Sequence, residues 1–370
     1  MKQTVCLNMI VKDEAHVIRR CLESVRPLID TWVIVDTGST DGTQDVIREA
    51  LSDLPGKLYE RPWKGFDGSR SEAIELARGQ GDYLLFIDAD DVMEVQPGFQ
   101  MPELTHGAYD IEVRYGPIVH WRPALVSNLL PWRYVGVLHE YIHCDTPFSR
   151  QTLEGFNMLC LGGGARLNEG QRAKYLRDAE LLEEGLRKEP DNPRYVFYLA
   201  QSWRDAGEPE KSLAAYDRRA ELGGFPEEVF CARLYAARLA IALNRPAEEV
   251  TQRLLRAHEG RPTRAEALGE LANYCRVHGE RWPLAYLFAR QAAAITQPAD
   301  ILFVEYSWYE WRALDELAVA AYWVGAYEES IDCCERLLDG GKLPAEERGR
   351  VAENLEFARR MSSKELVGAR

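Results

Sequence analysis

The 370-residue sequence lacks long apolar runs, paired cysteine motifs and an excess of positive charge. Its apolar runs are short, such as residues 83–87, whereas a membrane-spanning helix needs roughly 20 apolar residues. The first residues include acidic and basic side chains, and no signal-peptide cleavage site follows them. We therefore expect a cytoplasmic protein with no membrane span.

The eight cysteines form no Cys-x-x-Cys pair, which argues against a zinc ribbon and is typical of reduced thiols packed in a core. The formal net charge is −14, so a nucleic-acid partner is disfavoured, because phosphate binding needs clustered cations. A hydrophobic content of 46% with 28% charged residues is typical of a globular protein. A chain of this length accommodates two domains.

The first 90 residues alternate between predicted strands and predicted helices. The strands are expected at 4–11, 31–35, 57–60 and 83–87, and the helices near 17–25, 46–51 and 71–78. This alternation predicts a mostly parallel sheet covered by helices, in which ligands bind beyond the carboxyl ends of the strands. Residues 109–140 are again strand-like. The three glycines 162–164 are interpreted as a linker between domains, with a hinge as the alternative.

The second half of the sequence is helical and repetitive. Turn residues recur at spacings of 37, 35 and 46 positions, at Gly207, Asn244, Gly279 and Gly325. The tetratricopeptide repeat, a helix–turn–helix unit, has a period near 34. We expect an α/β domain at 1–168 and a domain of about four such repeats at 169–370, with an irregular helical bundle as the alternative.

An acidic cluster, Asp88-Ala89-Asp90-Asp91, follows the last of these predicted strands directly. Burying unpaired carboxylates is costly, so these side chains need cations or hydrogen-bond donors. A divalent cation with oxygen ligands meets that need and takes its remaining ligands from substrate phosphates. A solvated loop, or a helix capped by Asp91, is the alternative.

A second cluster, residues 35–43, follows the second predicted strand. Gly38 and Gly42 permit tight turns, and one of residues 39–41 can cap the next helix. Capping does not explain Asp36, which stands at the strand end, where a carboxylate could bind a base or a ribose.

Four motifs occur in order: Val11-Lys12-Asp13-Glu14 and the segments 35–43, 68–73 and 86–91. Over residues 1 to about 145 they resemble the family 2 glycosyltransferases, whose Rossmann-like α/β fold is called GT-A. The combination with tetratricopeptide-like repeats is similar to the layout of bacterial peptide and protein glycosyltransferases. The resemblance implies a UDP-sugar donor and bound Mn²⁺ or Mg²⁺.

The resemblance also implies roles for individual residues. Asp36 would bind the uracil, Asp90 would hold the metal ion, and Arg70 would lie near the phosphates or the donor sugar. The other residues implied at the nucleotide-sugar are Lys12, Glu14, Thr37, Gly38, Asp88 and Ala89.

The base that deprotonates the acceptor is expected in a later acidic motif, and Glu140 is the candidate. His139 beside it is a further metal ligand or a positioning group, whereas the family more often has Glu-Asp here. A locally satisfied His–Glu pair is the alternative. Trp121 and Trp132 lie in the expected acceptor region, where aromatic faces stack on sugars, although core packing is their commoner use.

We therefore expect an inverting, metal-dependent glycosyltransferase that acts on a peptide, protein, glycan or other soluble acceptor. The repeats are expected to bind partners or to form a homodimer. A nucleotidyltransferase, or a non-catalytic scaffold built on the repeats, is the alternative; the former should show a glycine-rich segment within residues 7–20, which contain no glycine.

Overall fold

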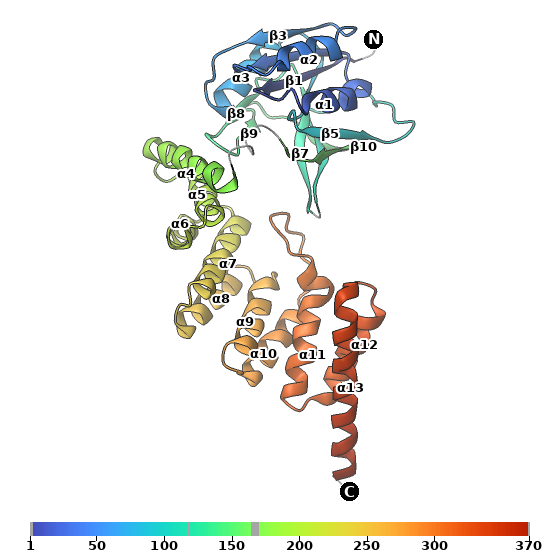
Figure 1. Ribbon diagram of the computed structural model, residues 1–370, viewed down its shortest axis with the longest axis vertical. Helices are drawn as coiled ribbons and strands as arrows, with labels where there is room; N and C mark the ends of the chain where they lie inside the picture. Colours follow the sequence, from blue (N-terminus) through green and yellow to red (C-terminus); the bar gives the residue numbers. More distant parts are fainter. Residues whose placement is uncertain (1–2, 117, 164–169, 369–370) are drawn as a thin grey trace. The chain divides into compact units, whose positions relative to one another are not determined.

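The computed structural model describes residues 3–116, 118–163 and 170–368 and divides into two compact units, Met1–Pro190 and Asp191–Arg370 (Figure 1). We call them the sheet unit and the helical unit. None of the helices in these ranges combines the length and the apolar character that crossing a membrane requires.

The sheet unit contains an eight-stranded sheet in the order β3-β2-β1-β4-β7-β6-β10-β5. Its strands are β1 (Val5–Val11), β2 (Thr31–Asp36), β3 (Gly56–Glu60), β4 (Tyr83–Phe86), β5 (Asp91–Val95), β6 (Ala108–Tyr115), β7 (Ile118–Ser127) and β10 (Arg150–Cys160). The first four strands are mutually parallel, as is the pair β6–β10, whereas β7 and β5 run antiparallel to their neighbours. The predicted mostly parallel α/β sheet is thus confirmed.

Helices cover both faces of the parallel part of the sheet. Helices α1 (Ile18–Val25) and α2 (Thr43–Ala50) pack on one face, and α3 (Phe66–Leu76) packs on the other. The two faces explain why β1 is apolar apart from the buried Asn8, since a strand buried on both sides needs no polar alternation. A short turn, η1 (Arg26–Leu28), follows α1, and a two-stranded ribbon, β8 (Arg133–Val135) with β9 (Tyr141–His143), adjoins α3.

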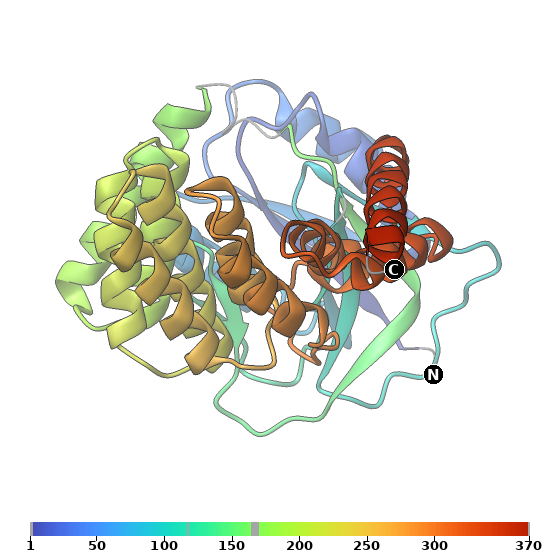
Figure 2. The ribbon, with the colours of Figure 1, turned by 90° about the horizontal axis from the view of Figure 1, so that it is seen from below.

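Helix α4 (Gln171–Lys188) belongs to the sheet unit, although the sequence alone assigns it to the repeats. The helical unit then contains consecutive helices that lie side by side (Figure 2). They are α5 (Pro193–Asp205), α6 (Pro209–Glu221), α7 (Pro226–Ala242), α8 (Ala247–Gly260), α9 (Glu266–Val277), α10 (Trp282–Ala293), η3 (Trp308–Arg312), α11 (Ala313–Trp323), α12 (Tyr327–Asp339) and α13 (Ala345–Gly368).

The four turn residues predicted from the repeats each join the two helices of a pair. Gly207, Asn244, Gly279 and Gly325 all have positive φ angles. They stand in α5–α6, α7–α8, α9–α10 and α11–α12, which confirms the tetratricopeptide-like organisation. The long spacing of 46 arises because the segment 294–307, between α10 and η3, is inserted before the last pair.

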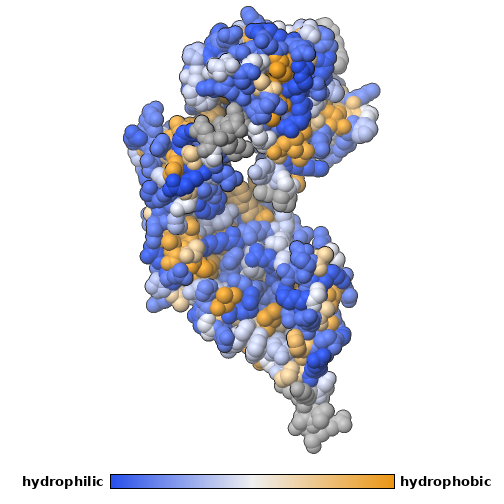
Figure 3. Space-filling view, viewed as in Figure 1, coloured by the Kyte–Doolittle hydropathy of each residue, from blue (hydrophilic) through white to orange (hydrophobic). Residues whose placement is uncertain are grey.

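The surface visible in Figure 3 is largely hydrophilic, with hydrophobic residues in separate groups. All eight cysteines carry free thiols, and seven of them are buried. The expectation that the cysteines pack in the cores is thus confirmed for these seven.

Candidate active site

Three motif loops follow the parallel strands β1, β2 and β4, so they meet at one edge of the sheet. The first two loops hold each other by hydrogen bonds. The amide of Thr40 donates to Asp13 at 2.7 Å, and the amide of Asp13 donates to the hydroxyl of Ser39 at 2.8 Å. Asp41 accepts from the amide of Ala15 at 2.9 Å. The polar residues of segment 39–41 therefore serve mainly to fix the two loops.

Asp36 lies at the end of β2 and is 1% exposed. Its Oδ1 accepts the amides of Gly38 and Ser39 at 2.8 and 2.9 Å. Its Oδ2 is buried without a hydrogen-bond partner among the described residues. A buried unsatisfied carboxylate oxygen costs about 1–3 kcal/mol or more, so this atom is suited to accept a hydrogen bond from a ligand.

Asp88 follows β4 and is held by arginines. Arg70 Nη2, from α3, donates to Asp88 Oδ1 at 2.5 Å, and Arg122 Nη2 lies 4.0 Å from Oδ2. Burial raises the pKa of Asp88, but the two guanidinium groups outweigh burial and hold the pKa below its usual value. Asp88 is therefore an ionised carboxylate at neutral pH.

Arg70 also binds Glu140, the candidate base. Arg70 Nε donates to Glu140 Oε1 at 2.6 Å, and the two side chains are 16% and 12% exposed. The adjacent Ser71 accepts from the amide of Tyr134 at 3.0 Å, which ties β8 to α3. Two neighbouring residues of α3 thus position the backbone of β8 and the Glu140 carboxylate in the loop that follows β8.

The burial of Asp91 and the resulting rise of its pKa were not predictable from the sequence. Asp91 is 5% exposed and begins β5, so the alternative of a helix cap is wrong. Burial, together with Asp88 and Asp90, raises its pKa to about 7, and the Cys160 thiol donates to its Oδ2 at 3.4 Å. The repulsion among three adjacent carboxylates favours a cation at this strand end.

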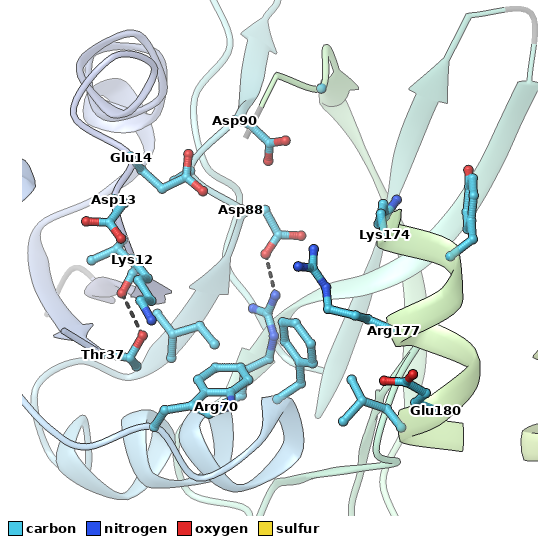
Figure 4. Close-up of a pocket in the computed structure, with 18 of the residues that line it drawn as sticks. Lys12, Asp13, Glu14, Thr37, Arg70, Asp88, Asp90, Lys174, Arg177 and Glu180 are labelled. Atoms are coloured by element: carbon cyan, nitrogen blue, oxygen red, sulfur yellow. Dashed lines mark hydrogen bonds and ion pairs between the residues drawn. The ribbon is translucent and has the colours of Figure 1, made fainter. Parts of the chain in front are cut away.

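A cavity of about 1380 Å³ lies at this edge of the sheet unit (Figure 4). The predicted residues that line it are Lys12, Glu14, Thr37, Arg70, Asp88, Ala89 and Asp90. Asp36, Gly38, His139 and Glu140 are not among its lining residues. The carboxylate of Glu140 binds Arg70, which lines the cavity. Asp36 precedes the lining residue Thr37 in the sequence.

The acidic residues fit a divalent cation only in part. Within the ranges that the structure describes, no group of three or more His, Cys, Asp or Glu side chains could hold a metal ion. A cation at Asp90 would therefore take most of its ligands from phosphate oxygens and water, as Mg²⁺ commonly does. His139 is exposed, with φ of 51°, and its assignment as a metal ligand stays a prediction.

Other lining residues were missed by the sequence analysis. Trp63 and Phe66 form an edge-on aromatic pair at the cavity, and Lys174 and Arg177 of α4 face it. The only available signal for α4 was a pair of cations three positions apart on one helical face. That pattern alone is too common on solvated helices to indicate a site.

The two tryptophans assigned to the acceptor region have different environments. Trp132 is 2% exposed and its indole donates to the carbonyl of Ser127 at 2.9 Å, so it is a core residue. Trp121 is 42% exposed and stays available for stacking. Of the glycine segment, Gly162 lines the cavity, and both Gly162 and Gly163 have positive φ, whereas Gly164 lies outside the described residues.

Comparison with known proteins agrees with this geometry. Residues 6–96 match the family described as glycosyl transferase family 2. The glycosyltransferase SunS encoded by the SPbeta prophage of Bacillus subtilis is 26% identical over 226 residues, which cover 57% of this chain and 51% of that protein. This chain thus spans about half the length of that relative.

Two other proteins are similar to this chain over shorter segments. The lipopolysaccharide core biosynthesis glycosyltransferase LpsC of Rhizobium meliloti is 30% identical over 131 residues, 35% of this chain and 43% of that protein. A TPR repeat-containing protein of Synechococcus elongatus is 41% identical over 88 residues, 24% of this chain and 20% of that protein. A solved structure of MamA aligns over 53% of this chain and 86% of that chain, with 14% identity and a TM-score of 0.34. Because this TM-score is low, we define the fold by the helices and strands given above and not by this alignment.

Proposed function

We propose that the chain transfers a sugar from a UDP-sugar to a peptide, protein or other acceptor, because residues 6–96 match glycosyl transferase family 2. The observation that carries this proposal is the convergence of four motifs, from the loops after β1, β2 and β4 and from α3, on one cavity. The helical unit would hold the acceptor or pair two copies of the chain.

We propose uracil as the nucleobase of the sugar-nucleotide, because Asp36 can accept a hydrogen bond from it. The N3–H of uracil is a hydrogen-bond donor, and the buried Oδ2 of Asp36 has no partner among the described residues. Lys12, Glu14 and Thr37 line the same part of the cavity, where the nucleoside would lie. Satisfying a buried oxygen that is otherwise unpaired favours uracil over bases that lack this donor.

Transfer is proposed to proceed by direct displacement at the anomeric carbon, with inversion. The acceptor atom forms its bond to that carbon while the bond to the diphosphate breaks, and Glu140 takes the acceptor proton. A divalent cation held by Asp90 and the phosphate oxygens would offset the charge that develops on the leaving diphosphate. Arg70 positions Glu140 and keeps Asp88 in place.

The test is a thermal-shift screen with UDP, CDP, GDP, ADP and their sugar conjugates in the presence of Mn²⁺. A ligand that binds only the native state at 100 times its Kd stabilises it by about 2.7 kcal/mol, so UDP compounds are expected to raise the melting temperature most. A screen in which no nucleotide stabilises the protein would overturn the proposal.

The variant Asp36→Asn tests the assignment of uracil as the nucleobase. Its amide nitrogen turns the acceptor at Oδ2 into a donor, which suits N3 of cytosine and opposes N3–H of uracil. We expect the preference for UDP over CDP to fall by about 10-fold or more. An unchanged preference for UDP would remove Asp36 from this role while leaving glycosyl transfer intact.

A further inference from the structure

Helix α4 contributes a wall to the cavity although it lies outside the matched family residues 6–96. Lys174, Arg177 and Leu181 recur at helical spacing and line the cavity. On other faces of the same helix, Ala179, Leu182 and Leu186 are buried. The amphipathic pattern therefore fixes which side chains of α4 face the cavity.

The sheet side of the cavity offers few cations to a negatively charged ligand. Arg70 uses Nε for Glu140 and Nη2 for Asp88. Lys12 is the remaining cation that lines the cavity from the motif loops, and it stands beside Asp13 and Glu14. A diphosphate placed against Asp88 and Asp90 would meet repulsion unless cations approach it from another side.

Helix α4 supplies cations on that other side. In Figure 4 the guanidinium of Arg177 points from α4 toward Asp88, and Lys174 lies one turn earlier on the same helix. Arg177 is exposed and Lys174 is half-buried, with its ammonium 5.0 Å from the ring centre of Tyr175. Guanidinium groups match the geometry of phosphate oxygens with two parallel hydrogen bonds, and a lysine adds a point charge.

We propose that Lys174 and Arg177 bind the diphosphate of the nucleotide-sugar and stabilise the charge that develops on it as it leaves. This inference rests on the proposed function and assigns the helix after the glycine segment to the donor site. Cations that are already in place where negative charge develops accelerate such a displacement, because no solvent has to reorganise around that charge.

The test compares uridine, UMP and UDP as ligands of the double variant Lys174→Gln/Arg177→Gln, by calorimetry in Mn²⁺. We expect UDP affinity to fall by about 10- to 100-fold and uridine affinity to change by less than about 3-fold, because only the phosphates meet α4. Lys188→Gln removes one charge from an exposed position of the same helix that does not line the cavity and should leave all three affinities unchanged.

The ratio of UDP to uridine affinity within one variant does not depend on how much of the protein is folded. A wild-type ratio in the double variant would overturn the inference, and so would an equal loss for uridine and UDP, which would mean a structural role. Wild-type protein that binds none of the three ligands would instead remove the proposed function and, with it, this inference.

Discussion

The two units of the molecule each contain a cluster of charged side chains, and the clusters differ in how completely their hydrogen bonds are satisfied. In the helical unit, Arg264 and Glu266 are both 0% exposed, and Arg264 binds Glu266, Asp300 and two backbone carbonyls. Glu266 also accepts from Tyr309 at 2.7 Å. The charges of this cluster are thus paired with one another and with backbone carbonyls, so the cluster needs no ligand.

The cluster of the sheet unit is open and incomplete. Asp88 is 36% exposed at the cavity, Asp36 has a buried oxygen without a partner among the described residues, and Asp91 has a pKa raised to about 7. Buried charge alone therefore does not indicate a functional site. The difference lies in incompletely satisfied carboxylates that line a cavity or stand next to its lining residues, since such groups gain free energy when a ligand binds.

The first prediction breaks the closed cluster. Arg264→Met leaves the buried carboxylate of Glu266 without its cation, so we expect the helical unit to lose about 3–5 kcal/mol of its free energy of unfolding. Urea unfolding followed by circular dichroism measures this loss. The affinity of the sheet unit for UDP should stay at the wild-type value.

The control for this variant is Arg336→Ala, which breaks an i,i+4 ion pair with Asp332 in which both side chains are more than 60% exposed. Its expected effect is about 0.5 kcal/mol or less. If Arg264→Met were no more destabilising than this control, the interpretation of a closed structural cluster would be wrong.

The second prediction removes a charge from the open cluster. Glu140→Gln keeps a side-chain oxygen for Arg70 but cannot take a proton, so the transfer rate is expected to fall by about 100-fold or more. UDP affinity and the free energy of unfolding should change little. Steady-state assays that follow UDP release, with calorimetry of UDP binding, separate these quantities. Unchanged turnover would exclude Glu140 as the base.

Much of the fold followed from local patterns. The strands before the two acidic clusters were predictable from apolar runs, and the turns at Gly207, Asn244, Gly279 and Gly325 from repeat spacing. Helix α3 begins five residues earlier than its pattern indicates, at Phe66 after Gly65, which has φ of 84°. Residues 66–69 are poor helix formers, so contacts within the fold determine their conformation.

The site was less predictable because its contacts join distant segments. Arg70 meets Glu140 across 70 positions, and α4 reaches a cavity lined mostly by residues more than 80 positions earlier. Trp132 was indistinguishable from Trp121 in the sequence, because burial of an aromatic residue depends on the packing around it. The motif loops were found because the carboxyl ends of parallel strands share one edge.

The most direct test of the open cluster is calorimetry of UDP binding to wild type and to Asp90→Asn, each with Mn²⁺ and with EDTA. We expect Mn²⁺ to raise UDP affinity by about 5- to 150-fold in the wild type and not in the variant. Wild-type binding that is independent of the metal, or an equal gain in the variant, would contradict the proposal that this cluster is completed by a cation and a diphosphate.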